Sequence, residues 1–114
     1  MNQPKETILA KTYDLLKEAT PRLNALPRNF KYNFSDRVLN HLADLLELMI
    51  DAVYAPPEPK KLILRSVNLK LEKLRFFFRL GFDLGLYKSS LYEDMIRKTD
   101  EIGRMTGGWL KSLN

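Results

Sequence analysis

The stretch from Pro59 to Gly85, PKKLILRSVNLKLEKLRFFFRLGFDLG, decides the fold class, because it predicts one long amphipathic helix. Proline suits the first position of a helix, and glycine suits the residue just beyond its end. Between them, one set of apolar side chains recurs at three- and four-residue steps, the spacing of a face packed in a helical bundle. The residues of this predicted core stripe are Leu64, Val67, Leu71, Leu74 and Phe78.

A second apolar stripe runs along the same segment, roughly opposite the first. It consists of Leu62, Leu69, Phe76 and Leu80. One bundle core cannot cover both sides of a helix, and exposed apolar patches of this size are uncommon on monomers. We therefore expect these four residues to form an oligomer interface. A deeply buried helix in an irregular monomer is the alternative.

The same segment carries the whole net charge of the chain, which is +5. Residues 60–85 hold seven basic and two acidic side chains, and the remainder holds twelve of each. A localised positive strip is typical of a surface that attracts a polyanion or an acidic partner, although pairing along a solvated face is the common alternative. The candidate binding residues are Lys60, Lys61, Arg65, Lys70, Lys73, Arg75 and Arg79, with Arg104 near the C-terminus.

Breakers and apolar spacing predict three further helices, over about residues 4–25, 33–55 and 90–113. Pro21 predicts a kink in the first of them, or an early end near Thr20, because proline lacks the amide donor and clashes with the preceding turn. Ser90 and Glu93 have the spacing of a capping box at the start of the last. The predicted core residues are Leu9, Tyr13, Leu16, Leu23 and Leu26 in the first, Phe34, Val38, Leu42, Leu45, Met49, Ala52 and Val53 in the second, and Leu91, Met95, Ile102, Met105, Trp109 and Leu113 in the last.

Four helices joined by short connections predict an all-α fold, an antiparallel up-down-up-down four-helix bundle. No segment alternates with the period of a strand. The 114 residues fit a single domain over residues 1–114, near the size at which a partner subunit adds much of the buried surface.

The residues show no pattern typical of an enzyme or a metal site. Cysteine is absent, and the single histidine, His41, has no nucleophile motif beside it, so we expect a structural or surface role for it. The acidic residues lack the histidines of a metal-ligand motif. We therefore expect no catalytic residue, metal or cofactor. No apolar run approaches the roughly 18 residues of a spanning helix, and the N-terminus lacks an apolar leader, so we expect a cytoplasmic protein without a membrane partner.

Several segments together resemble the accessory variability determinant proteins of diversity-generating retroelements, in particular the bAvd branch. The most specific are residues 74–80 (LRFFFRL) and residues 103–109 (GRMTGGW). Residues 13–16 (YDLL), with LPR at 26–28, and residues 45–50 (LLELMI) add to the resemblance, which spans nearly the whole chain. Thr106 stands where an aliphatic residue is expected in this family.

The resemblance implies a small four-helix bundle assembled as a homopentameric barrel with a basic surface. It implies a non-catalytic accessory protein that binds the retroelement reverse transcriptase and nucleic acid, template RNA or cDNA or both, during mutagenic retrohoming. A related family, the proteins encoded in intervening sequences of bacterial 23S ribosomal RNA genes, supplies the alternative of a structural oligomeric adaptor that contacts RNA or an acidic protein. Peripheral membrane attachment and enzymatic activity rank below both.

Overall fold

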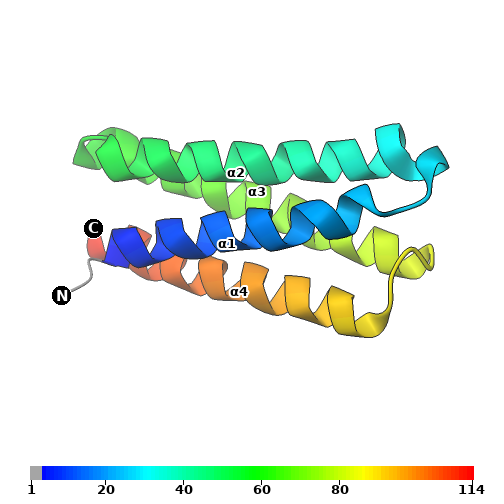
Figure 1. Cartoon of the computed structure of the whole chain (residues 1–114). Coiled ribbons are helices and arrows are strands. Elements are labelled where there is room, and N and C mark those ends of the chain that lie inside the picture. The colour runs from blue at the N-terminus through cyan, green and yellow to red at the C-terminus, as the bar shows by residue number, and fades with distance from the viewer. Residues whose placement is uncertain (1–3) are drawn as a thin grey trace.

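The computed structural model describes residues 4–114, in which the chain forms four α-helices and no strand. Figure 1 shows the helices lying side by side, with the chain reversing direction from each helix to the next. The predicted all-α class is confirmed. The helices are α1 (Pro4–Asn24), α2 (Asp36–Tyr54), α3 (Pro57–Asp83) and α4 (Ser89–Ser112).

The helices pack in a ring within the bundle. α1 packs on α2, α2 on α3 and α3 on α4, while α4 closes the ring against α1. The bundle is elongated, with extents of 44 × 23 × 20 Å. Each helix thus has two packed neighbours, a side in the core and a side facing outward. No helix in the described part of the chain is both long and apolar enough to cross a lipid bilayer.

The core stripes predicted for α2 and α3 are confirmed. Every predicted core residue of α3 is fully buried, and in α2 only Val53 is less than buried. In α4, Met95 and Ile102 are buried together with Thr106. The Thr106 hydroxyl donates to the Ile102 carbonyl oxygen at 2.8 Å, so this polar residue occupies the core without an unsatisfied donor.

The core face predicted for α1 is confirmed at Leu23, which is buried, but in the earlier turns the buried residues lie one position away from the predicted ones. Ile8, Leu15 and Ala19 are buried there, whereas Tyr13 of the predicted stripe is 54% exposed. α1 offers two adjacent apolar registers, and the one that contains the small Ala19 faces the core. The larger side chains of the predicted stripe lie at its edge, where Leu9 and Leu16 are partly buried.

The connection from α1 to α2 differs from the prediction. The predicted early end near Thr20 is wrong, because α1 continues through Pro21 to Asn24. Pro21 lies in the last turn, so its missing N–H removes a single bond just before the helix ends. A 3₁₀ turn (Arg28–Phe30) and a π-helical turn (Lys31–Ser35) then lead into α2.

The two ends of the α3–α4 connection behave differently. Gly85 adopts a φ of +74°, and the N–H groups of Gly85 and Leu86 donate to Phe82 and Gly81 carbonyl oxygens, both at 2.9 Å. These bonds form the glycine-terminated end predicted for α3. The capping box predicted for α4 is wrong, because the helix begins one residue earlier, at Ser89, and no side chain caps it.

Candidate nucleic-acid and subunit surface

The second apolar stripe of α3 lies on the outside of the bundle. Its four residues, Leu62, Leu69, Phe76 and Leu80, are 45 to 65% exposed and are called the α3 outer stripe below. The core stripe on the opposite side of the same helix is fully buried. The two-sided apolar character that the sequence predicts for α3 is therefore present. The oligomer interface itself stays a prediction.

One flank of α3 faces α4. On this flank, Arg75 is held by two carboxylates. Arg75 Nε donates to Asp100 Oδ1 of α4 at 2.8 Å, and Arg75 Nη1 lies 3.2 Å from Glu72 Oε2. Gly103 makes room for this guanidinium, because a Cβ atom there would lie 2.8 Å from Arg75 Nη2. Arg75 therefore joins α3 to α4, which leaves less of its charge for a ligand.

Two further candidates pair within α3 itself. Lys61 Nζ lies 3.3 Å from Glu58 Oε1, and Arg79 Nε lies 3.6 Å from Asp83 Oδ2. Both are neighbours one helical turn apart, and such exposed pairs contribute little to stability. They remain available to a stronger anion, because a phosphate can displace a weakly bound carboxylate.

The opposite flank of α3 faces α2. Lys70 Nζ lies 3.0 Å from His41 Nδ1 and 3.5 Å from Asp44 Oδ2, and the His41 ring packs 5.2 Å from the Phe77 ring. Burial, and next the charge of Lys70, lower the pKa of His41. A neutral His41 with its own proton on Nε2 accepts a hydrogen bond from the Lys70 ammonium at Nδ1. Lys70 and His41 thus connect α2 to α3.

The remaining candidates have no acidic partner among residues 7–114, whose side chains the structure describes. Arg65, Lys73 and Arg104 are exposed and form no ion pair there. Lys60 Nζ instead lies 5.2 Å from the centre of the Trp109 ring, a cation–π contact. Half of the eight predicted basic residues are therefore paired in the bundle, and the positive strip is smaller than the sequence count indicates.

A second group of basic residues was missed by the sequence reasoning. Four basic residues and one acidic residue fall within residues 22–37, at the connection from α1 to α2. Lys31 lies 3.2 Å from Asp36, and the other three form no ion pair with any of residues 7–114. A charge count over a short window, instead of over whole helices, would have found it. We call the four residues the end cluster: Arg22, Arg28, Lys31 and Arg37.

A groove of about 570 Å³ lies beside the end cluster. Arg28, Lys31 and Asn24 line it together with Tyr32, whose side chain is 75% exposed. Lys31 Nζ lies 5.4 Å from the centre of the Tyr32 ring. Basic side chains around an exposed aromatic ring are a combination found in proteins that bind single-stranded nucleic acid.

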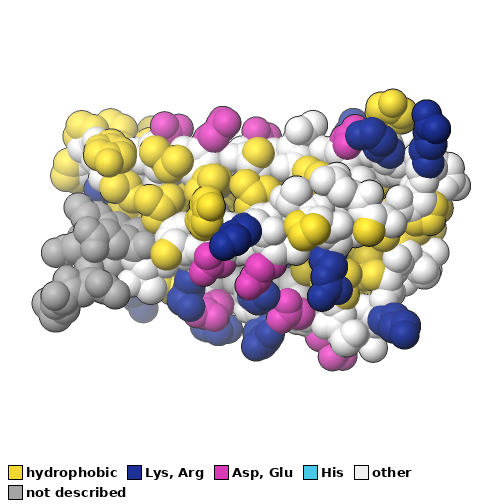
Figure 2. Space-filling model, in the orientation of Figure 1, with side chains coloured by type: hydrophobic (Ala, Val, Ile, Leu, Met, Phe, Trp, Pro, Cys, Tyr) yellow, Lys and Arg dark blue, Asp and Glu magenta, His cyan; other side chains and the backbone are white. Residues whose placement is uncertain are grey.

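An apolar surface along α1 and α2 was also missed. Figure 2 shows hydrophobic side chains gathered along the seam between these helices. Tyr54 is 81% exposed and Ile50 41%. The wrong core register of α1 hid this surface, because it assigned Tyr13 to the interior. We call it the α1–α2 face, formed by Leu9, Tyr13, Leu16, Ala43, Leu46, Ile50 and Tyr54.

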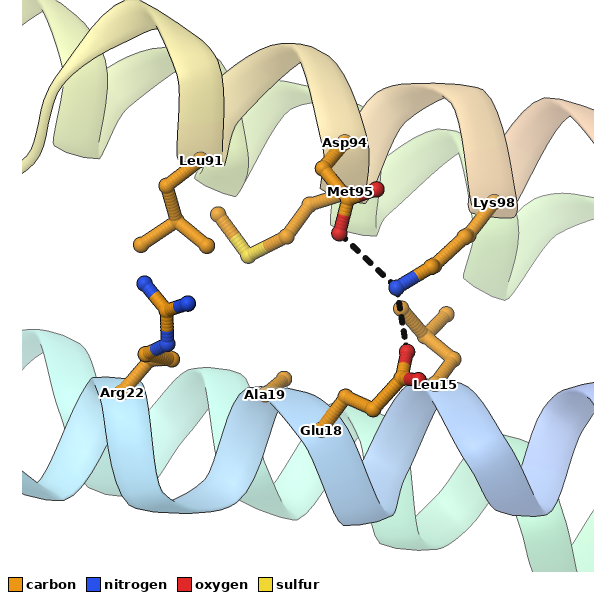
Figure 3. Close-up of a pocket in the computed structure, with 8 residues that line it drawn as sticks. All are labelled: Leu15, Glu18, Ala19, Arg22, Leu91, Asp94, Met95 and Lys98. Carbon is orange, nitrogen blue, oxygen red and sulfur yellow. Dashed lines mark hydrogen bonds and ion pairs between the residues drawn. The ribbon is translucent and has the colours of Figure 1, made fainter.

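A hollow of about 280 Å³ between α1 and α4 holds balanced charges. Figure 3 shows Lys98 of α4 between Asp94 on its own helix and Glu18 of α1. The hydrogen bond from Lys98 lowers the pKa of Asp94, and the same contact raises the pKa of Lys98. This hollow connects the two helices, and its two acidic and two basic side chains, Arg22 included, leave no surplus charge for a ligand.

Metal-binding geometry is absent from residues 7–114, where no three His, Asp or Glu side chains converge. The carboxylates of α2 and α4 instead face solvent or lysine and arginine partners.

Comparison with known families identifies the chain. A search of curated proteins finds no match. The sequence profile of the bAvd-like family matches residues 7–113, which covers all four helices apart from the first residues of α1. The match includes both segments on which the resemblance rests, LRFFFRL in α3 and GRMTGGW in α4. The chain therefore belongs to the bAvd-like family.

Proposed function

We propose that this protein is a non-catalytic accessory protein of a diversity-generating retroelement, which binds the reverse transcriptase and nucleic acid in the cytoplasm during mutagenic retrohoming. The observation that carries the proposal is the match to the bAvd-like family over residues 7–113. Its proposed assembly is a homopentamer, held together through the α3 outer stripe.

The surfaces support a binding role. Arg65, Lys73 and Arg104 have no acidic partner in the described part of the chain, and Lys61 and Arg79 are held only by exposed pairs. The end cluster adds cations next to an exposed tyrosine. Lysine and arginine side chains free of carboxylates neutralise phosphates and release their counterions, which is the main source of affinity for nucleic acid.

A salt titration tests the nucleic-acid part of the proposal. Binding of fluorescein-labelled single-stranded RNA and DNA is measured by anisotropy between about 50 and 200 mM salt. We expect the logarithm of affinity to fall linearly with the logarithm of salt, at a slope near −0.7 per phosphate neutralised. If neither the RNA nor the DNA binds at the lowest salt concentration, this part of the proposal is contradicted.

Two pairs of substitutions locate the contact. Arg28→Ser with Arg37→Ser removes two charges from the end cluster, and Arg65→Ser with Lys73→Ser removes the same charge from α3. The pair that makes the salt slope shallower identifies the surface that meets phosphate. The double variant whose salt slope equals that of the wild type serves as the matched control.

Co-purification with the reverse transcriptase encoded beside the same gene tests the polymerase part. Retention of the polymerase after nuclease treatment supports a direct protein contact. If the polymerase is lost while RNA binding persists, the structural adaptor of the intervening-sequence type is favoured instead.

A further inference from the structure

The apolar flank of α2 lies on the side of α1. Ala43, Leu46 and Ile50 recur at steps of three and four residues, which places them on one side of α2 at about 100° per residue. His41, on the other flank, contacts Lys70 of α3. The Ala43 flank therefore faces away from α3 and toward α1.

α1 contributes a matching flank. Leu9, Tyr13 and Leu16 share one side of the helix by the same spacing. Lys11, on the other flank, pairs with Glu101 of α4, so the Leu9 flank faces α2. Because α1 packs on α2, the two flanks adjoin and form one surface, the α1–α2 face. It lies on a different side of the bundle from the α3 outer stripe.

The charges beside the two apolar surfaces have opposite sign. Arg65 and Lys73 border the α3 outer stripe, one on each side, and neither has an acidic partner within residues 7–114. Glu47 and Asp51 border the α1–α2 face along its α2 edge, are exposed and have no basic partner there. Figure 2 shows acidic side chains along this edge. Lys17 lies at the opposite edge of this face, on α1, so the negative charge is confined to the α2 edge.

Self-pairing of either surface is unfavourable. If two α3 outer stripes met, Arg65 and Lys73 of one copy would lie close to the same residues of the other. If two α1–α2 faces met, Glu47 and Asp51 would approach each other. Like charges brought together at a contact repel each other and disfavour association. The α3 outer stripe of one copy against the α1–α2 face of another avoids both repulsions.

We propose that the α3 outer stripe of one subunit packs on the α1–α2 face of a second copy of this chain, with Arg65 and Lys73 directed toward Glu47 and Asp51. The contact joins two different surfaces, so it is head-to-tail and repeats until a ring closes. This inference rests on the oligomeric assembly in the proposed function. It assigns Arg65 and Lys73 to the subunit contact, and phosphate binding is left to the end cluster and to Lys61, Arg79 and Arg104.

Complementation between two surface variants tests the contact. Leu69→Glu damages the α3 outer stripe, and Ile50→Glu damages the α1–α2 face. Both sites are exposed, and circular dichroism checks that each variant folds as the wild type does. We expect each variant alone to be monomeric by native mass spectrometry. An equimolar mixture still contains one intact copy of each surface, so we expect a heterodimer of twice the 13.3 kDa subunit mass.

Other results overturn the proposal. An Ile50→Glu variant that stays oligomeric while Leu69→Glu is monomeric means that α3 pairs with itself. A mixture that stays monomeric, or a wild type that is monomeric at every concentration tested, also excludes the contact. If the monomer still binds RNA and the polymerase, only the subunit contact is excluded and the proposed function stands. Failure of the contact and failure of the proposed function are therefore distinguishable.

A charge exchange provides a second test that does not depend on the apolar residues. Arg65→Glu with Lys73→Glu should abolish assembly, because acidic groups then meet the acidic edge of the α1–α2 face. Adding Glu47→Arg and Asp51→Arg restores opposite signs at an unchanged net charge, and we expect the oligomer to return. If the fourfold variant folds but stays monomeric, the assigned charge pairing is wrong.

Discussion

Gly81 lies at a position in α3 that leaves no room for a side chain. It is buried, and a Cβ atom there would lie 2.6 Å from ring carbons of both Tyr87 and Phe34. The Tyr87 hydroxyl donates to the Phe78 carbonyl oxygen at 2.6 Å, and burial raises the pKa of Tyr87. Gly81→Ala forces these rings apart, so we expect the free energy of unfolding to fall by about 1–3 kcal/mol in urea denaturation.

Gly107→Ala is the matched control for Gly81→Ala. Gly107 also lies in a helix, but no atom comes within 4 Å of the Cβ position there. Alanine lowers the conformational entropy of the unfolded chain and should stabilise the protein by about 0.5–1 kcal/mol. Equal effects of the two substitutions would show that the space around Gly81 is not limiting.

Single residues also show what the sequence could predict. In α3 the two apolar stripes are far apart around the helix, so spacing alone separated the buried Leu71 from the exposed Leu69. In α1 the two registers are adjacent, and the choice depends on how closely small residues such as Ala19 let α1 approach its neighbours. The Arg75–Asp100 pair joins residues of different helices, and helical spacing carries no information about such partners.

At the scale of helices, His41 makes the contact between α2 and α3 sensitive to pH. Its lowered pKa means that folding favours the neutral ring, so the unfolded chain binds the proton more readily. The stabilisation is complete above the usual pKa of 6.5 and is lost as pH falls through the lowered value. We expect the urea midpoint to decrease as the pH falls below about 6.5.

His41→Gln is the control for this pH dependence. Glutamine keeps an oxygen acceptor for Lys70 but does not titrate. The carboxylates with lowered pKa values, Asp94 and Glu101, lose their protonation-linked stability only at more acidic pH. The urea midpoint of the variant should therefore be flat between about pH 6.5 and 5. A slope that persists in His41→Gln would assign the effect to another group.

The helices were predicted from the sequence, but the turns that connect α1 to α2 were not. Proline positions correctly divided the chain into four helices. The π-helical turn of Lys31–Ser35 has no comparable signal, because it depends on contacts such as the hydrogen bond from Ser35 Oγ to the Leu23 carbonyl oxygen at 2.9 Å. This missed segment contains part of the end cluster and its exposed tyrosine.

At the scale of the whole molecule, the proposed assembly predicts that stability depends on protein concentration. Subunits that associate only when folded shift the unfolding equilibrium by mass action, so Tm should rise as concentration is increased tenfold. The Leu69→Glu variant loses the α3 outer stripe and should unfold at a Tm independent of concentration. Differential scanning fluorimetry at several concentrations measures both, and a concentration-independent wild type would contradict the assembly.

The reversal of chain direction at each connection has a consequence for how such a ring presents itself. The start of α1 and the end of α4 lie at one end of the bundle, and the connection that holds the end cluster lies at the other (Figure 1). Cyclic symmetry keeps every subunit the same way up. If the helices run along the symmetry axis of the ring, its two rims differ. One rim carries the end clusters and is cationic, and the other carries both chain termini. Immobilising the protein through either terminus would therefore leave the cationic rim facing solution.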